Sequence, residues 1–145
     1  FRKLLSMKAL LKHALGLLLV LFCLNISAQT ETGKASYYHN KFEGHGTSNG
    51  EIFRQKKFTC AHKTLPFGTW LKVTCIKNNN VVYVRVNDRL PKSSKRCIDL
   101  TLLAAEKLNF VRSGLTQVNL EIVKAEDVPT EFQSEIELKN KAKKK

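Results

Sequence analysis

Asp88 is the side chain whose sequence context most clearly indicates chemistry. It follows the run 81–87, in which valines alternate with aromatic and polar residues, as in a β-strand with one buried face. Asp88 continues the valine face, and Pro91 ends the strand. A carboxyl group at the end of an apolar face is partly desolvated, which raises its pKa. The sequence therefore predicts that Asp88 is a general acid that works near neutral pH. The alternative is an aspartate that caps backbone amides in the turn after the strand.

The elements that would position Asp88 are short strands separated by turns. Alternating, β-branched or aromatic runs predict strands at 35–39, 58–62, 69–76, 81–88, 98–100 and 118–122. The asparagine-rich turn at 77–80 makes 69–88 a predicted hairpin, and Thr101 is a predicted cap for a helix that runs to about Asn109. A glycine-rich loop covers 42–50. Short strands with such turns and one helix predict a small closed β-barrel, because closure removes exposed strand edges.

The first 28 residues are typical of a secretory signal peptide. Basic residues precede an apolar run at 14–24, which is much shorter than the roughly 20 residues of a membrane span, and small residues then favour cleavage after Ala28. Cys23 is a poor candidate for lipid attachment because bulky Phe22 precedes it. The predicted organisation is a signal peptide at 1–28, a folded domain at 29–124 and a charged, disordered tail at 125–145, without a membrane span after cleavage.

The chain is strongly basic. Its 145 residues include 25 Lys and Arg against 12 Asp and Glu, and residues beyond 28 retain 21 and 12, a formal charge of +9. This balance favours polyanionic partners such as anionic lipid or an acidic wall polymer, while export argues against nucleic acid.

Three cysteines follow the predicted signal peptide: Cys60, Cys75 and Cys97. Export permits disulfides, and three thiols allow three different single bridges among which the sequence does not choose. Buried, unpaired thiols in apolar strands are the alternative. No cysteine or histidine spacing indicates a metal site, and no cofactor is predicted.

Five short segments occur in order along the chain: GKASYY (33–38), TSNGEIF (47–53), CAHKTLPFGT (60–69), VRVNDRLP (84–91) and IDLT (98–101). Their order and spacing resemble the rare lipoprotein A (RlpA-like) family of septal-ring lytic transglycosylases. The resemblance implies a mainly β fold, a six-stranded double-psi β-barrel related to barwin and expansins with one or two short helices. It also implies glycan chemistry in a groove over the barrel, with functional positions at Glu51, His62 and Asp88.

A lytic transglycosylase breaks the bond between N-acetylmuramic acid and N-acetylglucosamine without water. One carboxyl group can protonate the leaving oxygen and then accept the proton of the sugar's C6 hydroxyl as the anhydro ring closes. We assign this group to Asp88. Glu51 would stabilise positive charge or orient the sugar, and His62 would hydrogen-bond a carboxylate and tune its proton affinity. The alternatives are an exposed turn glutamate and a rim histidine satisfied by its neighbours.

The candidate substrate-binding residues are Tyr37, Tyr38, Thr47, Asn49, Asn87 and Arg89. Aromatic side chains stack on sugar faces, although packing of the barrel is their more usual role. Two of the departures from the family pattern bear on the candidate site. Arg54 stands where the family usually has aspartate and could pair with Glu51, lowering its pKa, and Leu90 replaces a glycine.

Three functions are compatible with the sequence. The first is an exported lytic transglycosylase of peptidoglycan in the periplasm or cell envelope. The second, favoured by Arg54, is a non-catalytic glycan-binding module of expansin type. The third is a basic protein whose lysine-rich tail binds anionic lipid or polymer.

Overall fold

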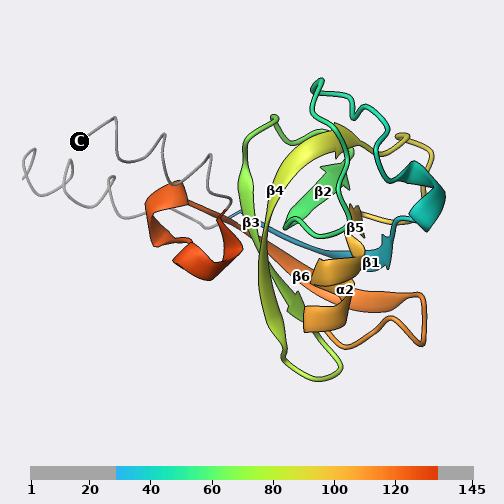
Figure 1. Cartoon of the computed structure of the whole chain (residues 1–145). Coiled ribbons are helices and arrows are strands. Elements are labelled where there is room, and N and C mark those ends of the chain that lie inside the picture. Colours follow the sequence, from blue (N-terminus) through green and yellow to red (C-terminus); the bar gives the residue numbers. More distant parts are fainter. Residues whose placement is uncertain (1–28, 134–145) are drawn as a thin grey trace, which may run out of the picture.

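The computed structural model describes residues 29–133, in which six strands close into a barrel (Figure 1). The strands are β1 (Thr30–Tyr37), β2 (Thr59–His62), β3 (Trp70–Cys75), β4 (Val81–Arg89), β5 (Ile98–Leu100) and β6 (Thr116–Val123). The helical elements are η1 (Asn40–Phe42), α2 (Leu102–Lys107), η2 (Ala125–Asp127) and η3 (Thr130–Phe132). Around the barrel the strand order is β1-β5-β2-β4-β3-β6, so neighbours in space are mostly not neighbours in sequence. The predicted fold class, a mainly β six-stranded barrel, is confirmed.

The barrel is mixed in strand direction. β1 pairs with β5, and β2 with β4, in parallel, whereas the other four contacts are antiparallel. β3 and β4 form the predicted hairpin, with register from Trp70 opposite Arg85 to Thr74 opposite Val81. The Thr101 hydroxyl accepts a hydrogen bond from the Ala104 amide, which confirms it as the cap of α2.

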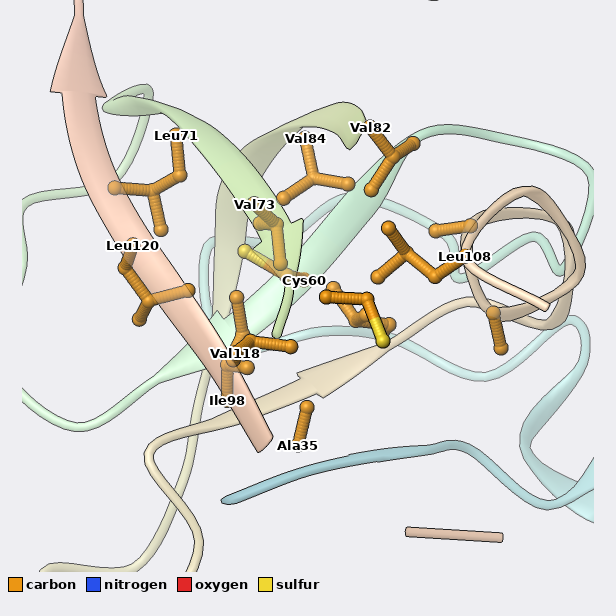
Figure 2. Packing of buried hydrophobic residues seen from close by; sticks show 14 of the residues in the cluster. Ala35, Cys60, Leu71, Val73, Val82, Val84, Ile98, Leu108, Val118 and Leu120 are labelled. Atoms are coloured by element: carbon orange, nitrogen blue, oxygen red, sulfur yellow. The ribbon is translucent and has the colours of Figure 1, made fainter. Parts of the chain in front are cut away.

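Strand alternation fills the barrel interior. On β4, Val82, Val84 and Val86 are fully buried, while Tyr83 and Arg85 between them are partly exposed. Figure 2 shows how side chains from several strands meet inside the barrel: Leu71, Val73, Val82, Val84, Val118 and Leu120. Each fully buried aliphatic side chain contributes about 1.5–3 kcal/mol. This core holds the outward-facing residues of β4 in fixed positions.

β1 begins five residues earlier than the sequence predicted. Residues 30–34 are polar and mostly exposed, so their pattern gives no strand signal. They become a strand because their backbone pairs with β6, from Thr30 opposite Glu121 to Lys34 opposite Gln117. Pairing between distant segments here overrides local propensity.

The C-terminal segment 125–133 packs on the barrel, so the prediction of a disordered tail from residue 125 is wrong for these residues. Val128 and Phe132 are buried in the core cluster. The Phe132 ring lies 4.9 Å from that of Phe58 and 5.3 Å from that of Tyr83, centroid to centroid. Figure 1 shows this segment in orange-red beside β4. The rest of the predicted tail, 134–145, and the predicted signal peptide, 1–28, lie outside the described residues.

Cys60, Cys75 and Cys97 are buried free thiols, as the alternative to a disulfide proposed. Burial raises the pKa of Cys60 and raises that of Cys97 to about 11, so both remain protonated at neutral pH. Between residues 29 and 133, no helix is long and apolar enough to cross a bilayer.

Gly33 allows β1 to approach Cys97 closely. A Cβ atom at position 33 would lie 2.8 Å from the Cys97 Sγ and 2.9 Å from its Cβ. We therefore expect Gly33→Ala to lower the free energy of unfolding by about 1–3 kcal/mol through overpacking. Gly46→Ala is the matched control, because a Cβ there meets no atom within 4 Å. Equal denaturation midpoints for the two variants would contradict this account.

Candidate active site

An irregularity in the β2–β4 pairing sets the direction of Asp88. Cys60 pairs with Val86, but the next residue, Ala61, pairs with Asp88, so Asn87 is an extra residue on β4. Such a bulge exchanges the two faces of the strand beyond it. Cys60 and Val86 belong to the core, so Ala61 and Asp88 lie on the outer face. The prediction that Asp88 continues the valine face is therefore wrong.

The Asp88 carboxylate accepts four hydrogen bonds. Oδ1 receives the Ser48 hydroxyl at 2.6 Å, the Ser48 amide at 2.9 Å and the Arg89 amide at 2.8 Å, and Oδ2 receives the Tyr38 hydroxyl at 2.5 Å. Partial burial raises the pKa of Asp88, but these bonds outweigh it and hold the pKa below its ordinary value. The predicted rise in pKa is thus wrong for the free protein, in which Asp88 is an anion at neutral pH.

Tyr38 acts on Asp88 as a fixed donor. Its ring packs against Phe53, with ring centroids 4.4 Å apart. Burial and the hydrogen bond to Asp88 raise the pKa of Tyr38, so its hydroxyl stays protonated. The sequence predicted that this side chain contacts substrate, whereas in the structure its polar end is occupied by Asp88.

The loop 47–51 docks on the bulged end of β4. The Asn49 amide donates to the Asn87 carbonyl at 3.2 Å, and the Glu51 amide donates to the Asn49 side chain at 3.0 Å. The Thr47 hydroxyl donates to Asn49 Oδ1 at 2.8 Å. Gly50 has φ of 89°, a conformation that favours glycine. Thr47, Asn49 and Asn87 therefore build the loop that places Ser48 on Asp88 and Glu51 beside Asn87.

Glu51 forms a two-point ion pair with Arg85. Arg85 donates to Oε1 at 2.8 Å and to Oε2 at 3.0 Å. The side-chain amides of Asn49 and Asn87 donate to the same carboxylate at 3.0 and 3.1 Å. The Arg85 hydrogen bonds, together with those amides, outweigh burial and lower the pKa of Glu51 to about 2. Glu51 is therefore a permanent anion rather than an acid.

Arg54 does not pair with Glu51. It lies 3.2 Å from Glu43 instead, so the expected effect on Glu51 comes from Arg85. Arg85 was not among the predicted site residues, although strand alternation places it on the same face as Asn87. Leu90, the other departure, is buried.

A second carboxylate, Asp99, lies in the same row of the barrel as Asp88. Across neighbouring strands, Ser36 pairs with Asp99, Asp99 with Ala61, and Ala61 with Asp88. The two aspartates thus flank a small alanine, with their backbones about 10 Å apart at two strand spacings. Asp99 accepts hydrogen bonds from the Ser36 hydroxyl at 2.6 Å and from Arg96 at 2.7 and 3.0 Å. The predicted strand 98–100 contained this residue, but three residues were too few to show which face its side chain takes.

His62 is not joined to Asp88 or Glu51 by any hydrogen bond within residues 29–133. Its ring is buried, and Nδ1 accepts the backbone amides of Thr64 and Leu65 at 3.3 and 3.1 Å. Nε2 lies 2.9 Å from Glu31 Oε2 and, since Nδ1 accepts, is the protonated nitrogen that donates. The histidine does bind a carboxylate, but that of Glu31 on β1, where it fixes the turn after β2.

Two other predicted residues lie at the margin. Tyr37 packs edge-on against Phe110 and donates its hydroxyl to the Val111 carbonyl, away from the Asp88 cluster. Arg89 stacks its guanidinium 3.9 Å from the Phe67 ring centroid and donates to the backbone carbonyls of His62 and Asp88, while its backbone amide alone donates to the Asp88 carboxylate. No group of three or more potential metal ligands occurs in the part of the chain that the structure describes.

Two pockets open on the barrel, and neither includes Asp88. One is lined by Arg85 with residues of the 56–59 and 131–133 segments, and the other by Glu31 with apolar residues of β3 and β6. Asp88 itself is partly exposed on the outer surface. The groove that the family resemblance implies is neither of these pockets.

Glu51 links stability to pH. Because its pKa is lower in the folded protein than its ordinary value of 4.5, its ionisation adds stability above that value, and the gain is lost as the pH falls toward 2. Wild-type protein should be more stable than Glu51→Gln at about pH 6, with a difference that shrinks below the ordinary pKa. Denaturant titrations at several pH values measure this. A difference that does not change with pH would contradict the ion pair with Arg85.

Comparison with known proteins identifies lytic transglycosylases as relatives of this chain. A family profile described as lytic transglycolase matches residues 30–120. An endolytic peptidoglycan transglycosylase RlpA of Haemophilus influenzae is 48% identical over 89 residues, which are 61% of this chain and 31% of that protein. The RlpA of Vibrio cholerae is 48% identical over 101 residues, 70% of this chain and 38% of that protein. The chain thus spans about a third of the length of these relatives.

Solved structures agree on the fold. Streptomyces papain inhibitor superposes with a TM-score of 0.54 and 24% identity, covering 69% of this chain and all of that one. A mutant Clavibacter michiganensis expansin in complex with cellohexaose gives 0.53 and 19%, covering 70% of this chain and 54% of that one. At these identities the likeness concerns the fold, a double-psi barrel of barwin and expansin type. With the family profile matching most of the barrel, and relatives nearly half identical, this chain belongs to the RlpA-like lytic transglycosylase family.

Proposed function

We propose that this protein is an exported peptidoglycan lytic transglycosylase. It would cleave the bond between N-acetylmuramic acid and N-acetylglucosamine and close a 1,6-anhydro ring on the muramic acid. Family membership and the names of the relatives support the reaction class. The signal-peptide pattern of residues 1–28 supports export to the periplasm or cell envelope.

One observation carries the assignment of Asp88. Its carboxylate lies on the outer face of β4, within hydrogen-bond distance of two hydroxyl groups and two backbone amides. Ser48 supplies a hydroxyl and an amide from a loop, and both compete directly with any sugar hydroxyl for Oδ1. A carboxylate that already binds hydroxyl groups at 2.5 and 2.6 Å is suited to accept the C6 hydroxyl of a muramic acid residue.

The reaction transfers two protons in turn through the same carboxyl group. Protonated Asp88 gives its proton to the glycosidic oxygen as the bond from that oxygen to C1 breaks and positive charge develops at C1. The resulting Asp88 anion then accepts the proton of the C6 hydroxyl while the C6 oxygen bonds to C1. Asp88 is protonated again at the end, and no water is consumed.

Substrate binding would load Asp88 with its proton. Burial is the largest single influence on its pKa and acts upward, while two of the four opposing hydrogen bonds come from Ser48. A glycan that displaces Ser48 removes bonds to the charged form and excludes water from the carboxylate. Both changes raise the pKa of Asp88 toward the range that a general acid requires.

Glu51 would serve as a fixed negative charge. Its pKa of about 2 keeps it ionised throughout the working range. It holds the loop 47–51 on β4 through Arg85 and Asn87, which in turn sets Ser48 on Asp88. Its charge would also favour the positive centre that forms at C1.

The second candidate is a non-catalytic, expansin-like glycan-binding module. It is favoured by the ionised state of both Asp88 and Glu51 in the free protein, since neither carries a proton to donate. The two functions differ in their products. The module would bind peptidoglycan and release nothing, whereas the enzyme leaves anhydro ends.

Digestion of peptidoglycan distinguishes these functions. We expect the protein beyond residue 28 to release muropeptides with 1,6-anhydro ends, identified by mass spectrometry. Asp88→Asn should reduce the rate at least about 100-fold, since general acid–base catalysis contributes that much or more. The variant retains a side chain of the same size and should stay folded by circular dichroism. Asp127→Asn, at an exposed carboxylate of η2, is the control and should digest at the wild-type rate.

Two results would overturn the proposal. Binding without any anhydro product would identify the expansin-like module. Reducing ends without anhydro rings would identify a hydrolase, because water rather than the C6 hydroxyl would then have attacked C1.

A further inference from the structure

We propose that the pocket beside Arg85 is a subsite for a carboxylate carried by the glycan strand. This inference rests on the proposed function and adds a contact away from the bond that is cleaved. The pocket has a volume of about 200 Å³ and lies between the 56–59 segment, β4 and the C-terminal segment. Its lining residues are Lys56, Lys57, Phe58, Thr59, Arg85, Glu131, Phe132 and Gln133.

The walls of the pocket are held in place by the barrel. Phe132 packs on Phe58 and Tyr83, and the side-chain amide of Gln133 donates to the Val128 carbonyl at 2.6 Å. The opposite wall is fixed as well, because the Lys57 carbonyl accepts the Thr101 hydroxyl at 2.6 Å. The pocket is therefore a property of the folded chain and needs no rearrangement to form.

The charge of the lining favours an anion. Three cationic side chains face one carboxylate, that of Glu131. Arg85 is engaged by Glu51, which leaves the two lysines as the main source of positive potential. Both lysines are exposed, and no ion pair within residues 29–133 involves either of them. A carboxylate near them gains charge-assisted hydrogen bonds, while the rings of Phe58 and Phe132 suit the apolar part of the group.

The pocket lies at a useful distance from Asp88. Along β4, Tyr83 contacts Phe132, Arg85 lines the pocket, and Asp88 follows three residues later. Three residues of strand span about 10 Å. A glycan held at Asp88 could therefore place a substituent of a neighbouring sugar in the pocket, and Arg85 would connect the two sites through Glu51.

Peptidoglycan offers a carboxylate from two sources. Each N-acetylmuramic acid carries a lactyl group, whose carboxylate is free on a bare strand and forms an amide on a strand with peptide stems. Stem peptides carry carboxylates of their own. Either carboxylate would bind the lysines in the same way. The structure therefore identifies the chemical group, a carboxylate, and an experiment must identify which part of peptidoglycan carries it.

The test measures binding, so that it does not depend on catalysis. Asp88→Asn protein beyond residue 28 is titrated at low salt with three soluble strands: bare, bare with methyl-esterified carboxyl groups, and stem-bearing. We expect Lys56→Gln/Lys57→Gln on this background to weaken binding of a carboxylate-bearing strand about three- to tenfold. Binding of the esterified strand should not change. Lys77→Gln/Lys107→Gln, two exposed lysines outside the pocket, is the control of equal charge.

Each outcome has a defined meaning. An effect on the bare strand assigns the lactyl carboxylate, and an effect confined to the stem-bearing strand assigns the stem. Equal weakening by both double variants would mean that only the net charge of the protein matters, and it would contradict the proposed subsite. Binding that the Lys56→Gln/Lys57→Gln variant does not weaken, or the absence of any binding, would contradict the subsite as well. Because no product is measured, failure here is distinct from failure of the transglycosylase proposal, which the digest decides.

Discussion

The extra residue that β4 inserts opposite β2 determines where the polar groups of the site lie. Without it, Asp88 would follow Val86 into the core, where an ionised carboxylate would be costly. With it, Asp88 lies outside, beside Ala61, and Asn87 is turned toward Glu51. A single irregularity in register thus separates an apolar interior from a surface that bears Asp88 and the loop that binds it.

Opposing influences then set the protonation state of Asp88. Burial favours the protonated form, and hydrogen bonds from Ser48, Tyr38 and the Arg89 amide favour the ionised form and prevail. The Glu51 ion pair acts indirectly, because it anchors the loop from which Ser48 reaches Asp88. A free protein with an ionised aspartate is compatible with an enzyme whose acid forms only when substrate replaces the loop contacts. The ligand-free state would then be the inactive protonation state of the same site.

Much of the barrel could be predicted from sequence, because alternation and turn residues are local signals. The valines of β4, the hairpin and the Thr101 cap all follow from neighbours within a few positions. The other features of the fold depend on contacts between segments that are distant in the sequence. The bulge at Asn87 leaves no mark in the alternation, and residues 30–34 become a strand only by pairing with β6. Phe132 packs against Phe58 and Tyr83, which lie far away in the sequence. The pKa of Asp88 could not be predicted for the same reason, since three of its four hydrogen bonds come from segments 40 or more residues away.

The pKa of Asp88, measured in the free protein and with a bound glycan, shows whether substrate binding protonates this carboxylate. Carboxyl-carbon NMR titration of the wild-type chain, alone and saturated with an anhydro-ended product strand, gives both values. We expect a pKa below the ordinary value of 3.8 in the free protein and an upward shift when glycan is bound. A pKa that stays the same or falls on binding would contradict the claim that substrate converts Asp88 from a hydrogen-bonded anion into an acid.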